Sequence, residues 1–233
     1  MSRTTFAVLT AVTLGLAARA VAQTADARPT VAVMYFDNGA MGKQHEDFDP
    51  LAKGISDLLI TEFAHDTGIR VVERDQLQKL MDEQNIDPKR VSQETVVHLG
   101  KLLGAHHMIF GGFVADQSGK MILTARAVDV ETSQVEYVSR VTGKTDNALT
   151  MITQLADSMT RGMKLPQMDV KVREARVETS KKVPFETVML YSRGLAEEDK
   201  GNKGKAVEYY KASLNKFPDY EPSRKRLATL SPG

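Results

Sequence analysis

Residues 30–72, TVAVMYFDNGAMGKQHEDFDPLAKGISDLLITEFAHDTGIRVV, indicate the fold class most directly. Its first seven residues are rich in β-branched and aromatic side chains and predict a buried strand. After a polar loop, Pro50 favours a helix start, because its ring fixes φ at a helical value. Residues 69–72 return to the strand pattern. A strand, a helix and a second strand in this order are typical of an α/β unit.

The pattern continues downstream with helices and then with three strands. Apolar residues three and four apart predict helices, and alternating or β-branched runs joined by short polar turns predict strands. The expected helices cover 75–84, 92–103 and 146–163, and the expected strands cover 107–114, 121–130 and 134–142. The sequence therefore predicts an α/β fold, a mixed β-sheet packed with helices in the order β-α-β-α-α-β-β-β-α.

The character of the chain changes after residue 163. Residues 164–184 contain two prolines and many charges, show no clear helical period and predict a linker. A short strand through Val170, Val172 and Val177 is an open alternative within this linker. Residues 185–233 have a helical period and predict a C-terminal all-α tail that includes a helical hairpin.

Residues 1–22 have the composition of a secretory signal peptide. Arg3 supplies a positive charge, an apolar run follows, and Ala20-Val21-Ala22 is a small-x-small cleavage site before Gln23. We expect cleavage between Ala22 and Gln23. The apolar run is shorter than the ~20 residues of a membrane-spanning helix, and no later segment is apolar enough to be one. In a bacterium the mature chain would therefore reach the periplasm without a transmembrane segment, either free there or peripheral to the outer membrane through partners.

Composition excludes several classes of function. Lysine and arginine number 31 against 30 acidic residues, for a net charge of +1, so no basic field favours nucleic acid. The chain has no cysteine. That excludes disulfides, thiolate catalysis, cysteine-ligated metals and the lipid-bearing cysteine of a bacterial lipoprotein.

The search for catalytic and ligand motifs finds none that is complete. Gly143-Lys144-Thr145 lacks the earlier glycine of a phosphate-binding loop, and Ser56 lacks the glycine of a nucleophile elbow. Adjacent strand residues point to opposite faces, which argues against a metal held by His106, His107 and His98. We therefore predict no enzyme activity, no metal and no cofactor. An unrecognised enzyme site is an open alternative, in the loop that carries Asp37, Asp47 and Asp49.

Five segments together resemble the CsgG family, the curli production assembly/transport component group. They are VAVMYFDN (31–38), LAKGISDLLITEF (51–63), VVERDQLQKLMDEQ (71–84), LGKLLGAHHMIFGGF (99–113) and ARAVDVETSQV (125–135). The resemblance covers roughly residues 30–163. It implies a periplasmic α/β domain that acts by docking onto envelope or secretion proteins.

The pore-forming member of that family is a lipoprotein whose subunits form an outer-membrane ring, each contributing two long β-hairpins. This sequence lacks the lipid-bearing cysteine, and the turn DQSGK (116–120) leaves no room for a long hairpin. The resemblance therefore implies an accessory protein of envelope assembly or secretion. The alternative is a homo-oligomeric, ring-forming subunit of a curli-like secretion complex that lacks its own transmembrane hairpins.

The tail is similar to one tetratricopeptide repeat, with matching residues at Gly194, Ala206, Tyr210, Leu214 and Pro218. A lone repeat must pack on the α/β unit or on another chain. Aromatic side chains are favoured interface anchors. The candidate partner-binding residues are Tyr191, Tyr209, Tyr210, Phe217 and Tyr220, and the open alternative is that they fill the seam between helices.

These patterns divide the chain into four parts. They are a signal peptide (1–22), a CsgG-like α/β domain (23–163), a linker (164–184) and a tetratricopeptide-like helical tail (185–233).

Overall fold

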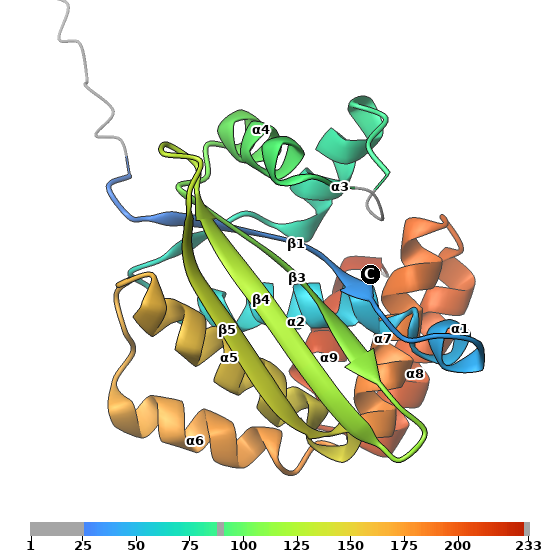
Figure 1. Ribbon diagram of the computed structural model, residues 1–233. Helices are drawn as coiled ribbons and strands as arrows, with labels where there is room; N and C mark the ends of the chain where they lie inside the picture. Colours follow the sequence, from blue (N-terminus) through green and yellow to red (C-terminus); the bar gives the residue numbers. More distant parts are fainter. Residues whose placement is uncertain (1–25, 88–90, 231–233) are drawn as a thin grey trace, which may run out of the picture.

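The protein is seen here as a computed structural model that describes residues 26–87 and 91–230 (Figure 1). The expected signal peptide and its cleavage site at Ala22 and Gln23 lie outside the described residues. The strands are β1 (Thr30–Asn38), β2 (Arg70–Val71), β3 (His107–Ala115), β4 (Lys120–Asp129) and β5 (Val135–Lys144). They form one sheet in the order β2-β1-β3-β4-β5. β1 runs parallel to β2 and β3, whereas β3, β4 and β5 are antiparallel, so the mixed sheet is confirmed.

The helices come before, between and after these strands. Those of the α/β unit are α1 (Lys43–Phe48), α2 (Leu51–Ala64), α3 (Arg74–Glu83), α4 (Gln93–Leu103) and α5 (Ala148–Gly162), with a 3-10 turn at Thr145–Asn147. Those that follow are α6 (Val170–Ser180), α7 (Phe185–Asp199), α8 (Lys203–Lys216) and α9 (Glu221–Leu230). Among the described residues, no helix is both long and apolar enough to cross a membrane.

Each face of the sheet has its own hydrophobic core. On one face, Ala32 and Met34 of β1 pack with Leu77 of α3 and Leu99 of α4. The opposite face of the sheet packs on α2 and α5, and the core there continues into α7, α8 and α9 (Figure 1). Alternate residues of a strand point to opposite faces, so a buried strand contributes side chains to both cores.

A β-bulge in β1 reverses this alternation. Val33 pairs with Ile109 and Phe36 pairs with Gly111, so β1 has one more residue than β3 in this interval. As a result Met34 and Tyr35 both belong to the core under α3 and α4, and Phe36 returns to the core over α2. A Cβ at Gly111 would overlap the carbonyl of Thr124 on β4. The glycine at this position therefore lets the backbones of β3 and β4 come close.

The C-terminal helices pack directly on α2. A Cβ at Gly54 of α2 would overlap the side chain of Ser192 of α7, so the glycine lets the two helices come close. Leu195 of α7 and Tyr210 of α8 belong to the same core cluster as Leu59 of α2. The C-terminal helices thus bury apolar side chains on the α/β unit, one of the two packing modes expected of the tail.

Two helices lie where the sequence predicts none. α1 occupies the expected loop after β1 and buries no residue. α6 occupies most of the expected linker, which corrects that prediction and excludes the alternative strand. Only Ser180 of α6 is buried, and ion pairs hold the helix instead: Arg173 to Asp157 at 3.3 Å and Arg176 to Glu62 at 2.9 Å. A helix held by charges has no apolar stripe for a sequence pattern to detect.

Candidate functional site

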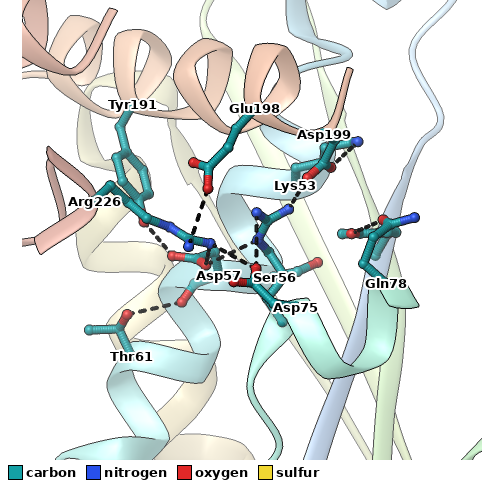
Figure 2. A network of polar contacts seen from close by, with 12 residues as sticks. Lys53, Ser56, Asp57, Thr61, Asp75, Gln78, Tyr191, Glu198, Asp199 and Arg226 are labelled. Atoms are coloured by element: carbon teal, nitrogen blue, oxygen red, sulfur yellow. Dashed lines mark hydrogen bonds and ion pairs between the residues drawn. The ribbon is translucent and has the colours of Figure 1, made fainter. Parts of the chain in front are cut away.

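Buried charges collect where α2, α3, α7, α8 and α9 meet, and Figure 2 shows them from close by. Asp57 projects from the buried side of α2. Its carboxylate lies 3.5 Å from Nε of Arg74 on α3 and 3.4 Å from Nη2 of Arg226 on α9. It also accepts a hydrogen bond from the hydroxyl of Tyr191 on α7. One carboxylate therefore contacts three other helices.

A pair of carboxylates at the end of α7 completes the network. Asp199 forms ion pairs with Arg74 and with Lys53 of α2. Glu198 lies 3.5 Å from Nη1 of Arg226 and accepts a 2.6 Å hydrogen bond from the hydroxyl of Tyr210. We call the set Lys53, Asp57, Arg74, Tyr191, Glu198, Asp199, Tyr210 and Arg226 the ion-pair network.

Burial makes these contacts matter for stability. The side chain of Arg74 is 4% exposed and that of Arg226 is 13% exposed. Burial opposes the charge on both guanidinium groups, yet their neighbours, Asp199 beside Arg74 and Asp57 beside Arg226, raise the pKa of each above its usual value. Both arginines thus stay charged, and removing one partner would leave a buried charge uncompensated. The network ties the C-terminal helices to the α/β unit.

Three of the five predicted partner-binding residues form an aromatic seam, and two of them, Tyr191 and Tyr210, also belong to the ion-pair network. The rings of Tyr191 and Tyr210 lie 5.7 Å apart, and those of Tyr191 and Tyr220 meet edge to face at 5.6 Å. All three are buried in the core. Tyr209 and Phe217 keep partial exposure. The structure thus brings three together inside the protein and leaves two at its surface, and partner binding by any of the five stays a prediction.

A cleft of about 640 Å³ opens next to the ion-pair network. Helices α2, α6 and α9 contribute most of its lining, and Asp57, Asp75, Tyr191 and Arg226 belong both to this lining and to the charged cluster in Figure 2. Its size is within the range of small-molecule and peptide-side-chain pockets. The cleft exists only because the C-terminal helices pack on the α/β unit.

The histidines and loop acids occupy structural positions. His106 Nδ1 accepts a 2.9 Å hydrogen bond from the backbone N–H of Thr30, and His107 Nδ1 lies 2.6 Å from Glu136. Over residues 26–87 and 91–230, no group of three histidine or acidic side chains could hold a metal ion. Burial raises the pKa of Asp37 at the end of β1. Asp47 and Asp49 lie in and just after α1, which has no buried residue.

Sequence patterns do not single out the charged members of the network. One signal was available: Asp57 lies on the same helix as Ile55, Leu58 and Leu59, a charge within an apolar stripe. A charge in that position needs a buried partner. Its partners Arg74 and Arg226 are far away in the chain, and nothing in their local sequence identifies them.

The family model of the curli production assembly/transport component CsgG matches residues 16–118. This span includes β1, β2 and β3 with the helices between them, somewhat less than half of the chain. It therefore supports the resemblance for the first part of the α/β unit. No curated protein matches the sequence.

Several solved structures share a distant likeness with the chain. The LpoB C-terminal domain from Salmonella enterica is 11% identical, with a TM-score of 0.37 over 50% of this chain and 82% of that one. The NMR structure of E. coli LpoB is 14% identical, with a TM-score of 0.40 over 48% and 55%. Lipoprotein GNA1162 from Neisseria meningitidis is 10% identical, with a TM-score of 0.39 over 49% and 79%. Likeness at this level bears on neither function nor partner.

Proposed function

We propose that this chain is a non-enzymatic accessory protein of bacterial envelope assembly or secretion that works in the periplasm by docking onto other proteins. The observation that carries the proposal is the match of the CsgG family model to residues 16–118. The signal-peptide composition of residues 1–22 supports an exported location.

The arrangement of the tail supports docking rather than a flexible appendage. Helices α7, α8 and α9 share a core with α2 and are joined to it through the ion-pair network. A rigid tail presents its exposed side chains in a fixed geometry, which lowers the entropic cost of binding a partner. Tyr209 and Phe217, both partly exposed, are the tail aromatics that we propose contact that partner. The repeat-like sequence of α7 and α8 suits the same role.

The test is site-specific crosslinking in live cells. The full chain, expressed with its N-terminal segment, carries a photo-crosslinking phenylalanine analogue in place of Tyr209 or Phe217. We expect a discrete crosslinked product with an envelope protein from these positions and none from the exposed Lys79 of α3, the control. If neither tail position nor a scan of other exposed positions crosslinks to an envelope protein, the docking proposal is wrong.

A second candidate is a ring-forming subunit, and one observation favours it. β5 is an edge strand of the sheet, and its Val135 and Val138 are 42% and 51% exposed. An unpaired edge with apolar side chains can pair with another copy. Light scattering on the purified full chain distinguishes the two. A single large closed species supports the ring, whereas a monomer or dimer leaves only the accessory role.

A further inference from the structure

Two residues that line the cleft between α2, α6 and α9 each carry a buried hydrogen-bond donor without a partner in the described part of the chain. These donors are the hydroxyl of Tyr220 and Nε of Arg176, and neither makes a hydrogen bond to any residue that the structure describes. Tyr220 is only 3% exposed. Burial raises the pKa of its hydroxyl well above the usual value, and so do the nearby charges of Asp57 and Glu62, which keeps it a donor. Buried polar groups are nearly always hydrogen-bonded, so two unused donors in one cleft point to an oxygen acceptor from outside.

The rest of the cleft combines apolar walls with an acidic opening. Its apolar lining includes Leu58, Ile60 and Ala64 of α2 together with Val172 and Ala175 of α6. The described lining includes six carboxylates and three cationic side chains. The carboxylates are Asp57, Glu62, Glu73, Asp75, Asp219 and Glu221, and the cations are Arg176, Lys225 and Arg226.

The excess of negative charge lies at the surface. Asp57 and Glu62 are compensated inside the protein by Arg74, Arg226 and Arg176. Asp75 is paired with Arg74 and Arg226, and Asp219 is paired with Arg224. Exposed Glu73 and Glu221 therefore remain against exposed Lys225, and none of these three forms an ion pair with another described residue. A negative opening attracts a cationic ligand and repels an anionic lipid headgroup or a nucleic acid.

We propose that this cleft binds an extended peptide segment of a partner protein that carries alternating basic and aliphatic side chains. Its main-chain carbonyl oxygens accept hydrogen bonds from Tyr220 and Arg176, its aliphatic side chains enter the apolar part, and its lysines or arginines meet the acidic opening. The proposal rests on the docking function above and names the chemistry of the segment that docks.

Binding is measured by fluorescence anisotropy with three labelled ten-residue probes. The first alternates lysine and leucine, the second replaces lysine by glutamate, and the third replaces leucine by serine. We expect the full chain to bind the lysine–leucine probe at least tenfold more tightly than either of the others, with affinity that falls as salt rises. Equal binding of all three probes, or preference for the glutamate–leucine probe, would overturn the proposal. So would binding of a fluorescent fatty acid that displaces the lysine–leucine probe.

Two pairs of variants locate the binding. Ala175→Trp fills the cleft from an exposed position on α6, and Ala228→Trp is its control, an exposed alanine of α9 outside the lining. We expect at least tenfold weaker binding in the first and no change in the second. The double variant Glu73→Gln, Glu221→Gln should bind the lysine–leucine probe less tightly and with a weaker dependence on salt. Its control is Glu131→Gln, in the turn between β4 and β5, which should change neither the affinity nor its salt dependence.

Tyr220→Phe separates binding from folding. The hydroxyl has no hydrogen bond in the free protein, so its removal leaves the urea midpoint unchanged or raises it slightly. We expect about five- to tenfold weaker binding of the lysine–leucine probe. Unchanged binding in this variant and in Ala175→Trp would overturn the proposal.

The two proposals fail in different ways. When the crosslinking experiment is repeated with Ala175→Trp, loss of the product with retention in Ala228→Trp supports the cleft as the docking site. A product that persists in both variants overturns the cleft and leaves the docking function standing. Absence of any product from the unaltered chain overturns the docking function itself.

Discussion

Tyr191 of α7 donates its hydroxyl hydrogen to Asp57 of α2, a residue 134 positions earlier in the chain. The bond is buried and joins the C-terminal helices to the α/β unit beside the cleft. Its acceptor is the same carboxylate that contacts Arg74 and Arg226. One contact thus links the tail, the sheet-covering helix and the candidate site.

Tyr191→Phe tests this bond. The change removes one donor to a charged carboxylate and leaves the ring in place, so we expect a loss of about 1.5–3 kcal/mol in the free energy of unfolding. Urea denaturation measures it. Tyr209→Phe, a half-buried tyrosine of α8, is the control and should change the free energy by less than about 0.5 kcal/mol. Equal stability of both variants would contradict a bond between Tyr191 and Asp57.

Arg226→Met tests the charges of the network. The substitution leaves Asp57 and Glu198 without one of their partners, and breaking a buried pair costs about 3–5 kcal/mol. Because Arg226 is still 13% exposed, we expect the lower end of that range. Arg224→Met is the control, since Arg224 pairs with Asp219 on the surface, where an ion pair contributes at most about 1 kcal/mol. A smaller loss in Arg226→Met than in its control would show that the network does not hold α9.

Gly194→Ala tests the packing of α7 on α8. A Cβ at Gly194 would overlap the ring of Tyr210, and overpacking of this kind costs about 1–3 kcal/mol. Gly204→Ala is the matched control, because a Cβ there meets nothing within 4 Å and alanine is the better helix former. Thermal unfolding should show a lower midpoint for Gly194→Ala and an equal or higher one for Gly204→Ala. The reverse order of the two midpoints would show that the ring of Tyr210 does not pack against Gly194.

Alkaline pH should unfold the protein as its tyrosines ionise. Burial raises the pKa of Tyr35, Tyr191, Tyr210 and Tyr220, four of the six tyrosines. The folded state therefore keeps protons that the unfolded chain loses above about pH 10, and stability falls as pH rises beyond that value. Phenolate absorbance followed with far-ultraviolet circular dichroism checks this. We expect these four to ionise together with loss of helix, and gradual ionisation of all six in a folded protein would contradict it.

The sheet and its helices could be predicted because their signals are local. Val31 and Val33 alternate with Ala32 and Met34 in β1, and Ser92 and Gly104 mark the ends of α4. Ser92 accepts a hydrogen bond from the backbone of Thr95, and Gly104 adopts the left-handed conformation, φ 63°. Each of these features depends on neighbours within a few residues.

The remaining features depend on residues that meet only in the folded chain. α6 has no apolar stripe, and its Arg176 forms a hydrogen bond with Glu62, which is 114 residues away in the chain. The ion-pair network depends on Arg226 and Asp57, which are 169 residues apart. The tail aromatics could be found as a group, but their burial could not, because a tyrosine at a helix seam and one at an interface have the same local sequence.

The bulge in β1 fixes the length of that strand. Met34 and Tyr35 lie on one face only because one extra residue separates Val33 from Phe36 relative to β3. Deletion of that residue would restore strict alternation with Phe36 still opposite Gly111, and it would remove one side chain from the core under α3 and α4. Natural variation in this strand should therefore change side chains but not their number, so that an alignment gap between positions 33 and 36 would mark a chain with a differently packed sheet.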